Sequence, residues 1–209
     1  MSMSGWSLRL YEVADELIWT AKLNAAWIGF TLLGGVALGI GPATLAAYDL
    51  ARRRVSHESF HVLPAFQTAF RREFRRGTVV VLPLLVAGIV LIGNYLYFAA
   101  LGSSASLPRL ACFVAFFGLA VISAWLLPMA VHYDLRLRDL LPKASLVALA
   151  RPASSVVLLF VLVAVGFVAG TVPVLGLLLA VGGWIQLDSW LCQRFFAENE
   201  ARLHLKGNS

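Results

Sequence analysis

Five long apolar blocks dominate the pattern of hydrophobic and polar positions along the chain. Each block has about the length that a helix needs to cross the ~30 Å hydrocarbon layer of a bilayer, which takes ~17–25 residues. The blocks are residues 23–47, 79–101, 110–131, 153–170 and 174–191. Only Thr171-Val172-Pro173 separates the last two, so we expect a tight helical hairpin there. The pattern predicts an all-α, polytopic membrane helical bundle with five transmembrane helices.

The composition agrees with this interpretation. Hydrophobic residues make up 60% of the 209 residues and charged residues 13%, about half the charged fraction of a soluble domain. The mean hydropathy is +0.81. A chain of this length leaves no room for a separate soluble domain, so we expect residues 1–209 to form a single integral membrane domain.

Basic residues are distributed unevenly between the connections. If the loops are assigned alternately to two sides, one side receives three Lys or Arg residues and the other receives fourteen. Short cytoplasmic loops are enriched in Lys and Arg. The pattern therefore predicts a multi-pass protein of the plasma membrane with the N-terminus outside and the C-terminus in the cytoplasm. The net charge of +6 is then a signal of topology, and we expect no nucleic-acid partner.

The first block contains several residues that affect helix geometry. Gly41-Pro42 lies near its inner end, and proline clashes with the preceding helical turn but fits the first turn of a new helix. We expect a helix break at Gly41 and Pro42, followed by a helix over residues 43–54. The small-xxx-small spacing of Gly35 and Gly39 is typical of close helix contacts in membranes.

The stretch from Pro64 to Arg76 has an amphipathic pattern. Phe66, Phe70 and Phe74 recur every four residues, which places them on one face of a helix. The opposite face carries Arg71, Arg72, Arg75 and Arg76. This pattern predicts a helix on the cytoplasmic side. Its phenylalanines either face lipid or the protein itself beside anionic headgroups, or they dock against a partner protein.

One short motif resembles a metal site. His57-Glu58-Ser-Phe-His61 has the H-E-x-x-H spacing that places two zinc ligands and a general base on one helical face. Pro64 would end such a helix one turn after the second histidine, and no third ligand is evident. We therefore expect a polar cytoplasmic linker, with no metal, no cofactor and no catalytic residue.

Other catalytic and transport signatures are also missing from the sequence. There is no nucleophile elbow and no Gly-rich phosphate loop. Ionisable residues at mid-membrane depth mark transport pathways, but Asp188 and Gln186 lie near the inner end of the last block and Asn24 and Asn94 near outer ends. This placement weighs against a proton-coupled pump and leaves a facilitator open.

Four segments together resemble a known family. The segments are Ile40-Gly-Pro-Ala-Thr-Leu-Ala-Ala-Tyr48, Phe66-Gln-Thr-Ala-Phe-Arg-Arg-Glu-Phe-Arg-Arg-Gly77, Leu127-Pro-Met-Ala-Val-His-Tyr-Asp134 and Pro173-Val-Leu-Gly176. With these four segments in this order, the chain resembles the bacterial YesL-like family. The resemblance implies a small inner-membrane protein of unknown biochemical activity, often associated with genes for carbohydrate uptake by ABC transporters.

We accordingly expect a protein without enzymatic activity. The leading hypothesis is an accessory or interaction subunit that contacts ABC transporter permease subunits, with the three phenylalanines as docking residues. A second hypothesis is a small membrane facilitator, which could be a homo-oligomer. A third is a membrane zinc hydrolase built on His57, Glu58 and His61.

Overall fold

The computed structural model describes residues 5–133 and 135–207, and in these ranges it contains helices and connections but no strand. In chain order, the helices are α1 (Gly5–Leu33), α2 (Ile40–Val55), α3 (Val62–Arg72), α4 (Phe74–Ala100), the 3-10 helix η1 (Gly102–Ala105), α5 (Ser106–His132), α6 (Leu137–Ala150), α7 (Pro152–Thr171) and α8 (Pro173–Gly207). The prediction of an all-α fold is confirmed.

Three segments within the described residues are long and apolar enough to cross a membrane. They are Phe74–Ala100, Gly102–His132 and Pro152–Thr171, and they coincide within a few residues with the second, third and fourth predicted blocks. The fifth block lies in the first half of α8, which continues as one helix to Gly207. The membrane-protein class is thus supported by three candidate spans.

The first apolar block differs from its prediction. Residues 23–47 do not form one helix, because the chain reverses over residues 34–39 between α1 and α2. Two residues of this connection, Gly35 and Val36, have positive φ angles of +75° and +48°. After the reversal α2 packs back along α1, and the indole N–H of Trp27 donates a hydrogen bond to Thr44 Oγ1 at 3.1 Å. Gly35 and Gly39 therefore belong to a turn and make no small-xxx-small helix contact.

Gly41 and Pro42 do not break a helix, because both lie in the first turn of α2. The break is at residues 34–39, and the expectation that Pro42 suits the start of a helix is confirmed. Gly41 has a packing role: a Cβ atom there would lie 2.4 Å from the carbonyl oxygen of Gly77 in α4. A Cβ atom on Gly77 would in turn lie 2.6 Å from Pro42 Cα. The two glycines allow α2 and α4 to cross with their backbones in contact.

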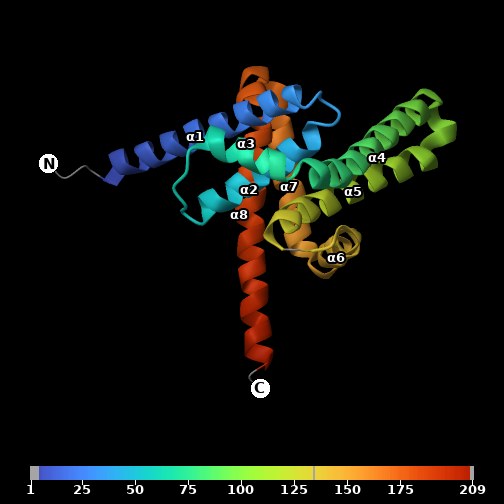
Figure 1. The fold of residues 1–209 in the computed structure, drawn as a ribbon. Helices are drawn as coiled ribbons and strands as arrows, with labels where there is room; N and C mark the ends of the chain where they lie inside the picture. The colour runs from blue at the N-terminus through green and yellow to red at the C-terminus, as the bar shows by residue number, and fades with distance from the viewer. Residues whose placement is uncertain (1–4, 134, 208–209) are drawn as a thin grey trace.

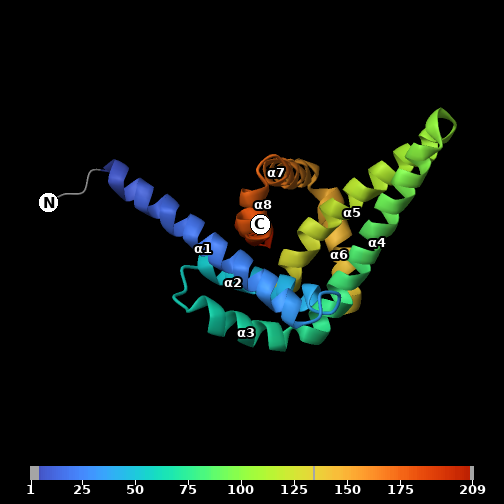
Figure 2. The ribbon, with the colours of Figure 1, turned by 90° about the horizontal axis from the view of Figure 1, so that it is seen from above.

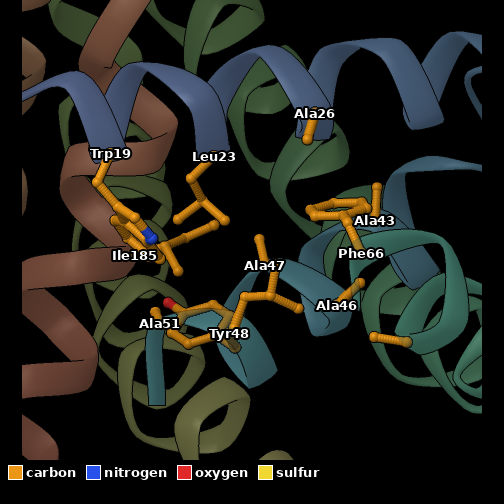
Figure 3. Close-up of a cluster of buried hydrophobic side chains, with 12 residues drawn as sticks. Trp19, Leu23, Ala26, Ala43, Ala46, Ala47, Tyr48, Ala51, Phe66 and Ile185 are labelled. Carbon is orange, nitrogen blue, oxygen red and sulfur yellow. The ribbon is translucent and has the colours of Figure 1, made fainter. Parts of the chain in front are cut away.

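Helix α2 lies at the centre of the molecule and contacts α1, α3, α4, α5 and α8 (Figure 1). Burial of this helix is nearly continuous from Gly41 to Ala51. Figure 3 shows part of the resulting core, in which Leu23 of α1, Tyr48 of α2 and Ile185 of α8 meet. We call residues 5–81, which comprise α1, α2, α3 and the start of α4, the base of the molecule.

Two helical hairpins project from the base (Figures 1 and 2). One is formed by α7 and α8, and the other by α4, η1 and α5. We call residues 82–117 of the second the outer hairpin. All residues of this segment are described, and Ala105 is its single buried residue. The base and the helices packed against it therefore hold the buried core, whereas the outer hairpin is apolar but has little protein around it.

Candidate functional site

The predicted amphipathic stretch is helical but divided at Glu73, and two of its three phenylalanines point into the protein. It comprises α3 and the start of α4, separated by Glu73. Phe66 is completely buried, and its ring lies 5.0 Å from that of Phe30 of α1. Phe70 also packs on Phe30, at 5.3 Å between ring centroids. Of the three phenylalanines only Phe74 is exposed, at 38%. Phe66 and Phe70 hold α3 on the base and offer no docking surface in this conformation.

The four predicted arginines fall into two groups. Arg71 and Arg75 are exposed to the surroundings. Arg72 forms ion pairs with Glu73 at 2.9 Å and with the buried Asp49 at 3.3 Å. The hydrogen bond to Glu73, together with the charge of Asp49, raises the pKa of Arg72. Arg72 therefore attaches α3 to α2, and Arg71 and Arg75 are available to lipid headgroups.

The fourth arginine of this face also has an internal partner. The guanidinium of Arg76 donates a hydrogen bond to the carbonyl oxygen of Leu135 at 3.3 Å. This bond links the start of α4 to the connection between α5 and α6. Arg76 is half-buried, so it contributes less than Arg71 and Arg75 to the basic surface.

The H-E-x-x-H segment is not a helix. α2 ends at Val55 and α3 begins at Val62, so His57, Glu58 and His61 lie in the connection. The carboxylate of Glu58 pairs with Arg53 at 2.8 Å. The H-E-x-x-H site binds zinc from one face of a helix, and residues 56–61 are not helical, so the zinc-hydrolase geometry is absent. Among the residues that the structure describes, no group of three His, Cys, Asp or Glu side chains could hold a metal ion.

A groove of about 1100 Å³ lies between α1, the end of α2 and the α7–α8 hairpin. One part of its wall is apolar and comes from α7 and α8. The other part is polar and comes from α1, the α2–α3 connection and Gln186 of α8. We call this cavity the α1–α8 groove.

An ion-pair cluster lies at the polar end of the groove. The guanidinium of Arg54 contacts Asp15, and it also contacts Glu16 at 3.0 Å. Burial alone would lower the pKa of Arg54, but the hydrogen bonds and charges of Asp15 and Glu16 outweigh it and raise the pKa. Glu16 in turn accepts a hydrogen bond from Gln186 Nε2 at 3.1 Å. The cluster thus joins α1, α2 and α8 at one point.

A polar pair lies in the core beside this cluster. The hydroxyl of Tyr48 donates a hydrogen bond to Asp188 Oδ2 at 2.6 Å, and Asp188 is completely buried. The thiol of Cys192 lies 3.8 Å from the other carboxyl oxygen. The sequence places Asp188 near the end of an apolar block but gives no sign of Tyr48 as its partner. An ionisable residue in an apolar segment is the signal that identifies this position.

A second polar contact fixes α1 against α8. The backbone N–H of Gly182 donates to Asn24 Oδ1 at 3.0 Å. A Cβ atom on Gly182 would lie 2.6 Å from the carbonyl oxygen of Thr20. Asn24 is therefore a packing residue at a close helix crossing, and this crossing forms one boundary of the groove.

Comparisons with known proteins place the chain in a family. Residues 20–95 match the family model described as "Protein of unknown function, DUF624". This range covers the second half of α1, the rest of the base and most of α4. The chain is 30% identical over 205 residues to "Uncharacterized protein YesV" of Bacillus subtilis (strain 168), covering 95% of this chain and 96% of the relative.

Two further relatives come from the same organism. "Uncharacterized protein YesL" is 30% identical over 158 residues, which cover 70% of this chain and 73% of that protein. "Uncharacterized protein YteU" is 26% identical over 169 residues, covering 79% and 75%. No solved structure matches the chain. The protein belongs to the YesL-like family of proteins of unknown function that the DUF624 model describes.

Proposed function

We propose that this protein is a membrane subunit without enzymatic activity that assembles with helices of other membrane proteins. The outer hairpin carries the proposal. Its exposed side chains are mostly apolar, and Ile89, Leu96 and Val114 are among them. A surface of this kind contacts either lipid or a partner helix.

Glycines favour a partner helix on this hairpin. Gly93 of α4, and Gly118 of α5 directly after the outer hairpin, have open space where a Cβ atom would be. Small residues on an open helix face let the backbone of another helix approach closely, which is how membrane helices associate. In the base, by contrast, Gly41 and Gly77 already use such a contact within the chain.

ABC-type permease subunits for carbohydrate uptake are the proposed partners. This assignment rests on the resemblance to the YesL-like family, and the relatives themselves bear no functional name. We place the docking surface on the outer hairpin, because Phe66 is buried and Phe70 is partly buried against Phe30. A second copy of the chain is the alternative partner for the outer hairpin.

The topology that we propose has four crossings, formed by α4, α5, α7 and the first half of α8. Asp15 and Glu16 of α1 contact Arg54 at the end of α2, so both ends of the α1–α2 pair lie on one side of the membrane. With both termini in the cytoplasm, every one of the 17 Lys and Arg residues except Arg109 lies on the inner side. This distribution follows the positive-inside rule better than five crossings do.

Site-specific photo-crosslinking tests the assembly. A photoreactive residue at Ile89, which is 69% exposed on the outer hairpin, is compared with one at Val156, which is 65% exposed on α7. We expect a protein adduct from Ile89 in native membranes, identified by mass spectrometry as a permease subunit, and lipid adducts alone from Val156. Lipid adducts alone at both positions would refute the subunit role, and a dimer adduct would replace the permease with a second copy.

The α1–α8 groove supports a small facilitator as the second candidate function. Its polar end and apolar wall (described above) could bind a solute at the membrane boundary. Uptake of sugars into proteoliposomes that contain the purified protein alone tests this candidate. Transport that is lost when the groove is filled by Val168→Trp would favour the facilitator over the subunit.

A further inference from the structure

The α1–α8 groove has the length and polarity of a site for an amphiphile. Its volume is about 1100 Å³, and its walls come from four separate segments of the chain. The apolar wall includes Val165 and Val168 of α7 and Leu175 and Leu179 of α8. These residues lie on the α7–α8 hairpin, which is the part that we place in the bilayer. An acyl chain is the ligand that suits this wall, because it buries apolar surface without needing polar partners.

The opposite end of the groove presents charged groups of both signs. Arg54 is satisfied by Asp15 and Glu16, and Glu58 by Arg53. No ion pair to Glu12 exists among the described residues, although Glu12 lines the groove one helical turn before Glu16. Glu12 is therefore a carboxylate at the mouth that is available to a cationic group.

Gln186 supplies a second acceptor in the same place. Its amide nitrogen donates to Glu16, which leaves the amide oxygen Oε1 facing away from that bond. Oε1 is buried, and no donor to it exists in the described part of the chain. A buried acceptor without a donor is unfavourable by about 1–3 kcal/mol, so a ligand with N–H groups would stabilise this position.

Aromatic and basic side chains indicate at which depth of the membrane the polar end of the groove lies. Trp190 of α8 lines the groove, and the guanidinium of Arg194 lies 4.2 Å from the centre of its ring. Tryptophan next to arginine is typical of the headgroup level of a membrane. The polar end of the groove thus lies where a lipid headgroup would be, with the apolar wall extending toward the membrane interior.

We propose that the α1–α8 groove binds a phospholipid with a primary ammonium headgroup, namely phosphatidylethanolamine, from the leaflet on the side of Arg54. The ammonium group carries N–H donors for Glu12 and for Gln186 Oε1, and the phosphate lies toward His57, which lines the groove, and toward Arg194 beside Trp190. Phosphatidylcholine has the same charge but no N–H donor, and phosphatidylglycerol has no ammonium group. The proposal is independent of the subunit role proposed above.

Native mass spectrometry of the full-length protein in detergent tests the headgroup. The purified protein is delipidated and titrated with phosphatidylethanolamine, phosphatidylcholine or phosphatidylglycerol of identical acyl chains. We expect one phosphatidylethanolamine to remain bound at a collision energy that removes the other two lipids. Equal retention of all three lipids would overturn the proposal.

Variants locate the site in the groove. Val168→Trp fills the apolar wall and should abolish the retained lipid, whereas Val156→Trp on the outward face of the same helix should retain it. Glu12→Gln should weaken phosphatidylethanolamine binding about fivefold, the effect of one charge near a membrane surface, and Asp139→Asn on α6 is the matched charge control. Thermal unfolding of each variant confirms that it is folded, and Ala164→Trp provides a second filled groove if Val168→Trp is not. Lipid retention in both filled variants would place the site elsewhere and overturn the proposal.

Discussion

Helix α2 and the outer hairpin are both apolar, yet they are built for different surroundings. α2 is buried along most of its length and carries polar groups with defined partners, such as Tyr48 with Asp188 and Asp49 with Arg72. The outer hairpin has a single buried residue and no ion pair among its described side chains. In lipid an unpaired polar group is unfavourable, so polar residues are retained where the protein itself provides the partner. The comparison separates the part of the chain that specifies the fold from the part that is free to contact lipid or a partner.

The largest expected difference between the two regions is the side of the membrane from which they can be labelled. In a chain with Cys112→Ser and Cys192→Ala, we expect an impermeant thiol reagent to label Ser104→Cys at the tip of the outer hairpin in intact cells. Arg9→Cys and His57→Cys of the base should be labelled only after permeabilisation, because Asp15 and Glu16 of α1 contact Arg54. External labelling at position 9 would restore the five-crossing topology with an outer N-terminus.

Glycine substitutions should affect the two regions very differently. Gly77→Ala places a Cβ atom 2.6 Å from Pro42 Cα, so the helices must separate, and we expect a loss of about 1–3 kcal/mol in stability. Gly93→Ala in the outer hairpin has open space and should be neutral or stabilising, since alanine favours helix over glycine. Thermal unfolding in detergent, followed by size-exclusion chromatography, measures both changes. A comparable loss for Gly93→Ala would show that the outer hairpin is packed as tightly as the base.

Removal of one hydroxyl group makes a finer test. Tyr48→Phe deletes the donor to Asp188 and leaves a buried carboxyl group without that bond, which should cost about 1–3 kcal/mol. Tyr97→Phe in the outer hairpin changes an exposed tyrosine and should stay within about 0.5 kcal/mol. The same unfolding assay compares the two variants. If Tyr48→Phe is as stable as Tyr97→Phe, the buried pair contributes nothing to the cohesion of the base.

The smallest expected effects separate the two groups of arginines on α3. Arg72→Gln removes one partner of Asp49 but leaves Arg52 at 3.3 Å, so a loss of at most about 1 kcal/mol is expected. Arg71→Gln should leave stability unchanged and weaken binding to anionic lipid by about 1 kcal/mol. Flotation with vesicles that contain anionic lipid, together with thermal unfolding, distinguishes the two outcomes. Equal unfolding temperatures for both variants would show that the Arg72–Asp49 pair does not hold α3 in place.

Hydropathy alone predicts most of the fold but misses the reversal in the first apolar block. α4, α5 and α7 follow their apolar runs closely, because a long run without charge has few alternatives to a membrane helix. The reversal at residues 34–39 is hidden because Leu32, Leu33, Val36 and Leu38 keep the segment hydrophobic. The density of glycines there was the available signal, and their spacing equally fits a helix contact.

The amphipathic stretch over 64–76 shows a similar limit for the candidate sites. Its periodicity correctly gives a helix with one aromatic face. Whether that face meets lipid, a partner or the chain itself depends on Phe30, which is far away in sequence. The groove and the Tyr48–Asp188 pair also depend on tertiary contacts, so no local sequence motif predicts them.

The hydrogen bond between Tyr48 and Asp188 joins residues separated by 140 positions, and this has a consequence for biosynthesis. α2 leaves the ribosome early, whereas its partner helix α8 follows much later. Until α8 arrives, the face of α2 that contains Tyr48 lacks its cover, so the base cannot reach its final packing during most of translation. A chain that terminates before Asp188 would retain every apolar hairpin needed for insertion except the last, yet it would present an uncovered polar face to membrane quality control. Completion of the core therefore waits for the synthesis of α8.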